Sequence, residues 1–408
     1  MELVPDLVNA FHRFMQNPHK LDKGCASTTA VAQALYELDY SEPEIYLLGV
    51  HHIQIEGSFG PPVDAAAKLR AYAAIYADVL ARNRMCLCGM LAAEYATLSK
   101  PMREEVRRFF GDESGDELQM CINFNLNQTM ALAVVRGDAG AMVHGMRALP
   151  TLPKDAQWGN FVRNHDEWSL DKLTEAERGE VFSQFGPKED MQLFGRGLRR
   201  RLPTMLDGDQ ARIRMVYGLM FSMPGAPVLF YGEEIGMSEN LAIPGRMSVR
   251  SPMQWSDEKN GGFSTAQPEN LRRPIVSGKR WGPAAVNVAV QRRDHNSLLN
   301  WMERLIRRRH ETPEIAYGQW NVVPVKQASI LAVRYDWDGR NVLVVHNLAS
   351  KPCTATFKVE ATAGWEGLID LFGQGDFSLA KDGAVSIDLE AYGCRWLRVR
   401  RSGEAILL

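Results

Sequence analysis

The chain has 408 residues, of which 45% are hydrophobic and 24% are charged, and its formal net charge is −2 at pH 7. This composition is that of an ordinary globular protein, and the length predicts two or three domains. The balanced charge argues against a nucleic-acid or membrane surface, and no apolar run is long enough to cross a bilayer. The N-terminus lacks a basic region followed by an apolar stretch, so we expect no secretory signal. The six scattered cysteines favour a reduced, cytoplasmic compartment.

The first domain, residues 1–109, is predicted to be helical. The spacing of apolar residues indicates short helices within 1–64, a helical pair within 65–109 and a basic helix over 102–110. An amphipathic pair of this kind more often packs in a core or a dimer interface than carries chemistry, so a homo-oligomer is expected as one possibility.

The second domain, residues 110–313, alternates between strand and helix patterns. Strands are expected at residues 120–126 and 158–162 and at 227–231, with helices at 129–149 and 209–223. Strand and helix in this order predict a parallel α/β barrel or sheet.

The third domain, residues 314–408, changes to short stretches in which apolar and polar residues alternate. A hairpin is expected over 330–345, with its turn at Trp337-Asp338-Gly339, and further strands follow to residue 399. This pattern predicts a small antiparallel β domain.

The polar cluster at the end of one predicted strand is the strongest candidate site. The apolar pair Phe161-Val162 leads directly into five polar residues, Arg163, Asn164, His165, Asp166 and Glu167. A parallel strand that delivers its C-terminal end into a site has this form, with the carboxylate of Asp166 meeting positive charge and the neighbouring Arg and His binding substrate hydroxyls. The alternative is a strand end whose charges are only solvated.

Two further stretches lie where a site would be built. The strand at 227–231 ends in glycine and acids, including Glu234, and an aperiodic loop over 241–263 carries Arg250. Long ordered loops beside a strand end are usually functional. The basic run at 194–202 is predicted either to be a solvated face or to hold a loop over the site.

From about residue 110 to 405 the chain resembles the C-terminal half of the α-amylase family, closest to its trehalose-synthase and α-glucosidase-like members. The resemblance is carried by three motifs in the right order, at residues 161–167, 225–237 and 250–255. It implies an α/β plus all-β fold class. Strands 6–8 of a (β/α)8 barrel would be followed by an antiparallel β-sandwich, with an α-helical segment at the N-terminus.

The same resemblance implies roles for individual residues. Asp166 would be the carboxylate that supports an oxocarbenium-like transition state, and His165 would bind sugar hydroxyls. Arg163, Asn164 and Glu234 are expected to contact the substrate, and Arg250 to form its rim. The expected partner is an α-glucoside such as maltose or trehalose.

The chain departs from the family pattern upstream of residue 120. Retaining chemistry needs a nucleophile and an acid, which the family carries on its fourth and fifth strands. Neither the Arg-x-Asp segment nor the strand-end Glu is present there, and the third-strand Asp-x-x-x-Asn-His pattern is also missing. About three of eight strands remain, which cannot close a barrel, so we expect the chain alone to be inactive.

The upstream segments resemble other proteins. Residues 65–110 are similar to the ligand-binding and dimerising helices of tetracycline-repressor-type regulators, without their DNA-binding helices, and residues 1–64 faintly resemble a helical-repeat protein. The sequence therefore resembles a composite, or chimeric, chain. An alternative function follows: a helical interaction or regulatory module fused to a non-catalytic sugar-binding remnant.

No metal or cofactor is predicted. His51 and His52 are adjacent and so point in different directions, and Cys86 and Cys88 do not have zinc spacing. The family resemblance allows calcium, but no run of oxygen ligands with calcium-loop spacing is visible.

Overall fold

The computed structural model describes residues 4–16, 31, 34–35, 120–152, 156–360, 364–373, 375–380 and 382–402. The chain divides into two compact units, residues 1–117 and 118–408. In the first unit, helix α1 (Val4–Gln16) buries Phe11, which packs in a small cluster with Leu35. The helices expected at 65–110, with their repressor resemblance, lie outside the described residues, and the predicted domain boundaries stay predictions.

The second unit begins with a parallel sheet of three short strands. Strand β1 (Met120–Ile122) pairs with β2 (Gln157–Phe161), which pairs with β6 (Ala226–Val228), so that the order is β1-β2-β6. Helices α8 (Phe124–Arg136) and α9 (Gly140–Arg147) join the first two strands. Three helices lie between β2 and β6 in the chain: α10 (Glu175–Phe185), α11 (Leu202–Met205) and α12 (Gln210–Phe221).

Capping side chains set where these helices begin. The first strand ends at Ile122 rather than at the predicted residue 126, because the Asn123 side chain accepts a hydrogen bond from the Leu126 amide at 3.0 Å and starts α8 there. The predicted single helix over 129–149 is two helices, since Gly137 adopts a left-handed conformation (φ 63°) that ends the first.

Strand β6 is also shorter than predicted, ending at Val228 instead of Tyr231. The Phe230 amide donates to the Glu233 carboxylate at 2.8 Å, so the chain turns at this point instead of continuing the ladder.

A second, antiparallel sheet lies after β2 in the chain, with the order β3 (Trp168–Ser169), β5 (Gly197–Leu198), β4 (Gln192–Leu193). The expected loop at 241–263 contains only two 3-10 turns, η4 (Gly245–Val249) and η5 (Lys259–Gly262).

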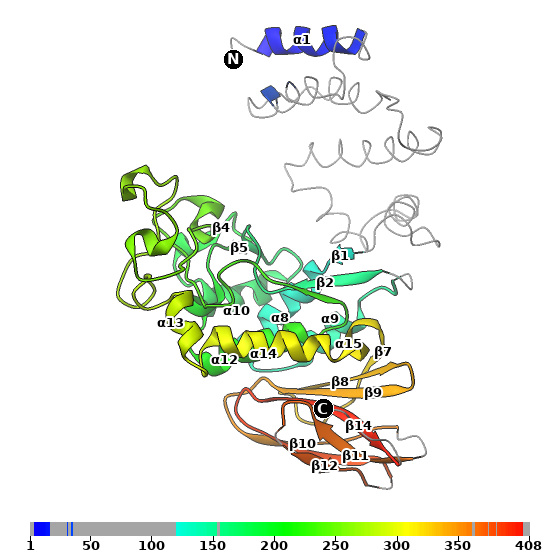
Figure 1. Cartoon of the computed structure of the whole chain (residues 1–408). Coiled ribbons are helices and arrows are strands. Elements are labelled where there is room, and N and C mark those ends of the chain that lie inside the picture. Colours follow the sequence, from blue (N-terminus) through cyan, green and yellow to red (C-terminus); the bar gives the residue numbers. More distant parts are fainter. Residues whose placement is uncertain are drawn as a thin grey trace. The chain divides into compact units, whose positions relative to one another are not determined.

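The remaining helices connect the sheet region to the C-terminal domain (Figure 1). These helices are α13 (Val288–Arg293), α14 (Leu298–His310) and α15 (Pro313–Tyr317). Two further 3-10 turns are η3 (Glu189–Met191), between α10 and β4, and η6 (Pro268–Asn270), between η5 and α13. Helix α8 packs on β2, α12 packs on β2 and β6, and α14 packs on α12. Three parallel strands joined by helices agree with the predicted C-terminal part of a (β/α)8 barrel.

The C-terminal domain is antiparallel, and its predicted strands are confirmed. Six strands form one sheet in the order β12-β11-β14-β9-β8-β7, and two form a ribbon. The sheet contains β7 (Gln319–Val322), β8 (Ile330–Trp337), β9 (Arg340–Asn347), β11 (Trp365–Asp370), β12 (Asp376–Ser378) and β14 (Cys394–Arg401); the ribbon is β10 (Cys353–Lys358) with β13 (Ala384–Leu389). Asp338 (φ 47°) and Gly339 (φ 72°) make the predicted hairpin turn between β8 and β9.

A buried polar contact joins the two parts of the second unit. The Tyr335 hydroxyl on β8 donates to the Ser222 carbonyl at 2.6 Å, and the Ser222 hydroxyl lies 2.7 Å from Nε2 of His346 on β9. All three residues are buried, so the end of α12 is fixed to the β domain by directional bonds as well as by apolar packing. No helix in the described part of the chain is long and apolar enough to cross a membrane.

Candidate functional site

The carboxylate of Asp166 lies just after the C-terminal end of β2, among positive groups. Its Oδ1 is 2.8 Å from Nη2 of Arg250 and 3.7 Å from Nε of Arg246, and its Oδ2 is 3.5 Å from Nε2 of His165. The side chain is 33% exposed, whereas that of His165 is 64% exposed. The structure therefore brings Arg250, Arg246 and His165 around one accessible carboxylate.

The backbone at Asp166 is held by two of the other predicted residues. The Asn164 side chain accepts a hydrogen bond from the Asp166 amide at 2.9 Å. Arg163 is 1% exposed, and it donates to the carbonyls of Asp166 (2.7 Å) and Arg200 (2.8 Å). Burial lowers the pKa of Arg163 to about 10. In this structure Arg163 therefore fixes the turn that presents Asp166, while Asn164 is only partly buried beside it.

One residue of the site, Arg246, was not singled out from the sequence, and its partner Glu167 was named only as part of the polar cluster after the strand. Arg246 in η4 makes a bidentate pair with Glu167, with Nε 2.5 Å from Oε2 and Nη2 3.1 Å from Oε1, and the Glu167 side chain is 2% exposed. Arg246 lies four residues before Arg250 in the same loop, so one loop supplies both guanidinium groups that face the end of β2. The four-residue spacing of Arg246 and Arg250 was the available sequence signal for Arg246. The sequence did not indicate its pairing with Glu167, because the two residues lie 79 positions apart.

The acids that follow β6 have different environments. Glu234, the predicted substrate contact, is half-buried. Glu233 is 3% exposed and is bonded to the Phe230 amide and, at 3.3 Å, to the Tyr217 hydroxyl. Burial raises the pKa of Glu233 to about 7, although the Phe230 amide and the charge of Arg201 act to lower it. Glu233 is thus a buried acid of the scaffold, and Glu234 is the more accessible of the two.

The basic run is not a solvated face, and the prediction that it holds a loop is the one the structure supports. Arg201 is 1% exposed, donates to the carbonyls of Val249 (2.6 Å) and Tyr231 (2.9 Å), and lies 4.7 Å from the centroid of the Phe230 ring. Arg199 donates to the carbonyl of Leu241 at 3.0 Å. These bonds hold the loop at Leu241 and at Val249, on either side of Arg246 and directly before Arg250.

This arrangement places two guanidinium groups and an imidazole within 4 Å of one carboxylate. Such a set can accept and donate hydrogen bonds to sugar hydroxyls, and the carboxylate can stabilise developing positive charge. Within the described ranges, no three His, Cys, Asp or Glu side chains are grouped so that they could hold a metal ion.

Comparison with known proteins identifies the source of this fold. A family model for the α-amylase catalytic domain matches residues 191–318, and a model for the sucrose hydrolase-like C-terminal domain matches residues 339–398. The chain is 34% identical over 301 residues to a trehalose synthase/amylase of Mycobacterium tuberculosis, a match that covers 72% of this chain and 50% of that protein. It is 35% identical over 277 residues to a trehalose synthase of Thermus thermophilus, covering 67% of this chain and 28% of that protein.

A solved structure agrees at the level of the fold. The crystal structure of the α-amylase from H.orenii superposes with a TM-score of 0.53 at 16% identity, covering 91% of this chain and 64% of that one. The second unit is thus a piece of a (β/α)8 barrel with an antiparallel β domain. The chain belongs to the α-amylase family, and its second unit corresponds to the C-terminal half of proteins of that family. The chain spans about half the length of the first curated relative it matches.

Proposed function

We propose that this chain binds α-glucosides of the maltose and trehalose type at the end of β2, with Asp166 as the central group. The observation that carries the proposal is the accessible Asp166 carboxylate, oriented by Arg250 at 2.8 Å and placed on a turn that Arg163 fixes from beneath. His165 and Asn164 flank it, Arg250 forms the rim, and Glu234, which follows β6, is proposed as a further substrate contact. Relatives named as trehalose synthases support an α-glucoside as the ligand.

We further propose that the chain alone does not turn these sugars over. Retaining hydrolysis or transglycosylation needs two carboxylates about 5–5.5 Å apart, one as nucleophile and one as acid. Asp166 would correspond to neither, because the family motifs that carry them are absent from this sequence. A carboxylate that stabilises a sugar cation cannot by itself form and break the glycosidic bond, so binding without turnover is expected.

The test is to measure binding and turnover separately. Isothermal titration of the purified chain with maltose and trehalose should show saturable binding that Asp166→Asn weakens at least tenfold, since a charge-assisted hydrogen bond contributes about 1.5–3 kcal/mol. Chromatography of maltose incubated with the chain should show neither glucose nor trehalose. Release of either sugar that Asp166→Asn abolishes would refute the inactive assignment, and binding that Asp166→Asn leaves unchanged would refute the site.

Self-association and a cytoplasmic setting belong to the same proposal. Among the described residues β1 and β6 each pair only with β2, and they expose Met120 (46%), Ile122 (40%) and Val228 (36%). Unpaired strand edges with apolar side chains favour pairing with another chain. Size-exclusion chromatography with light scattering over a range of concentrations tests this, and a monomer at every concentration would contradict it.

The proposed cytoplasmic setting agrees with the cysteines. Cys121, Cys353 and Cys394 form no disulfide bond, as expected in a reducing compartment.

A further inference from the structure

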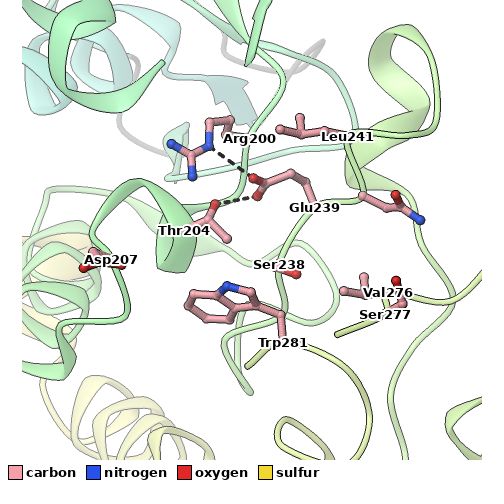
Figure 2. A pocket seen from close by; sticks show the side chains of 10 residues that line it. Arg200, Thr204, Asp207, Ser238, Glu239, Leu241, Val276, Ser277 and Trp281 are labelled. Atoms are coloured by element: carbon pink, nitrogen blue, oxygen red, sulfur yellow. Dashed lines mark hydrogen bonds and ion pairs between the residues drawn. The ribbon is translucent and has the colours of Figure 1, made fainter. Parts of the chain in front are cut away.

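A cavity lies beside the loop that follows β6, and none of its lining residues belongs to the group formed by residues 163–167, Arg246 and Arg250. It has a volume of about 340 Å³ and is formed by the region of α11, by residues 238–241 and by residues 276–281. Figure 2 shows the indole of Trp281 on one side of Ser238, and Val276 and Ser277 on the other. A volume of this size is at the lower end of the range for small-molecule sites.

The hydroxyl of Ser238 is an unpaired polar group in the wall of this cavity. Ser238 is 2% exposed, and its Oγ has no hydrogen-bond partner among the described residues. Burying a hydroxyl without a partner is unfavourable, so most buried hydroxyls in folded proteins are bonded to protein, water or ligand. The geometry therefore provides one buried donor and acceptor that a ligand in the cavity can satisfy.

The three charged groups of the wall are already paired: Arg200 with Glu239, and Asp207 with Arg280 outside the wall. The Glu239 carboxylate accepts hydrogen bonds from the Arg201 amide (2.8 Å) and from the hydroxyl of Thr204 (2.5 Å), and it pairs with Nε of Arg200 at 3.1 Å. The dashed lines in Figure 2 mark the two side-chain contacts. A charged ligand would find no unpaired opposite charge here, whereas a neutral ligand with hydroxyl groups needs none.

Trp281 gives the cavity an aromatic wall. The guanidinium of Arg280 lies 5.0 Å from the centroid of its ring and pairs with Asp207 at 2.6 Å. The backbone carbonyl of Trp281 also accepts a hydrogen bond from Gln254 at 3.1 Å. An indole next to hydroxyl and amide groups can pack against the C–H face of a sugar ring while its hydroxyls bond to Ser238 and Asn240.

We propose that this cavity is a binding site for a neutral polyhydroxylated molecule of monosaccharide size, separate from the site at Asp166. Trp281 packs on the ring of the ligand, and Ser238 bonds to one of its hydroxyls. The site does not depend on the proposed function, because none of the residues around Asp166 lines it. Arg200 is the link between the two, since its side chain lines the cavity and its carbonyl accepts the 2.8 Å bond from Arg163.

The experiment uses the full chain with glucose as the probe and gluconate as a charged probe of similar size. Saturation-transfer NMR and isothermal titration should show saturable glucose binding in the millimolar range and weaker gluconate binding. Ser238→Ala should weaken glucose binding about 2–10-fold, the range for one hydrogen bond, and Trp281→Ala should weaken it by at least as much. Trp255→Ala is the matched control, because that tryptophan is 48% exposed and does not line the cavity.

Asp166→Asn separates this proposal from the proposed function. Glucose binding that is unchanged in Asp166→Asn and weakened in Ser238→Ala supports the cavity site, whatever maltose does at Asp166. Binding that is lost in Asp166→Asn and retained in both cavity variants overturns it, as does an absence of saturable glucose binding by the wild-type chain. Ser238→Ala removes only one oxygen, so it keeps the test valid even where Trp281→Ala does not fold.

Discussion

The buried contact between α12 and the β domain makes stability depend on pH through one histidine. His346 is fully buried, its Nε2 is bonded to the Ser222 hydroxyl, and its Nδ1 has no partner among the described residues. Burial lowers the pKa of His346 from 6.5 to about 3. Between these two pH values the unfolded chain binds a proton that the folded chain does not, so the free energy of unfolding falls as the pH falls.

The size of this effect follows from the shift in pKa. Each pKa unit corresponds to about 1.4 kcal/mol, so lowering the pH to 5, which is 1.5 units below the unfolded pKa, costs about 2 kcal/mol. At pH 3 the loss from this one residue approaches about 5 kcal/mol, and above pH 6.5 it vanishes. Two kilocalories are a large fraction of the total stability of an ordinary domain, which is about 5–15 kcal/mol.

Urea unfolding at pH 7 and pH 5 tests the prediction in the wild type and in His346→Gln. The glutamine amide can still bond to Ser222 but does not titrate, so the wild type should lose about 2 kcal/mol more than the variant between the two pH values. Tyr335→Phe is the control, because it removes the neighbouring 2.6 Å bond to Ser222 without adding or removing a group that titrates there; it should lower stability by about 1 kcal/mol at both pH values. Equal pH dependence in wild type and His346→Gln would refute the reasoning.

Three further variants test other parts of the structure. Arg246→Ala leaves the buried carboxylate of Glu167 without its bidentate partner, and it should lower the free energy of unfolding in urea by about 3–5 kcal/mol. Adding Glu167→Gln should recover part of that loss. A loss below about 1 kcal/mol would show that this ion pair does not stabilise the fold. Burial raises the pKa of Glu233 to about 7, so its contribution to stability is present below pH 4.5 and is lost as the pH rises through 7. Between pH 4.5 and pH 8 the wild type should therefore lose about 3 kcal/mol of unfolding free energy relative to Glu233→Gln. A difference between the two proteins that stays constant with pH would contradict this. Thr174 forms a capping box with Glu177 at the start of α10, so Thr174→Ala should lower the thermal unfolding free energy by about 1 kcal/mol and Thr174→Ser should not.

The sequence was sufficient for features that depend on neighbouring residues. The hairpin turn at Asp338-Gly339 and the strand that leads into the polar cluster at 163–167 were predicted because turn chemistry and apolar patterning are local properties. The succession of strand and helix predicted a parallel barrel or sheet, and the resemblance to the α-amylase family narrowed this prediction to strands 6–8 of a barrel. Boundaries were less certain, because a single cap such as Asn123 moves the start of a helix by several residues.

What only the tertiary structure decided is which charges are buried and which distant groups pair. The local sequence of the basic run at 196–201 does not tell which of its four arginines are buried. The fold places Arg201 in the core, where it donates to backbone carbonyls. Arg246 meets Glu167 across 79 positions, and Ser222 meets His346 across 124. A local pattern carries no information about such partners, since the burial of a charge is set by the packing of segments that are far apart in the chain.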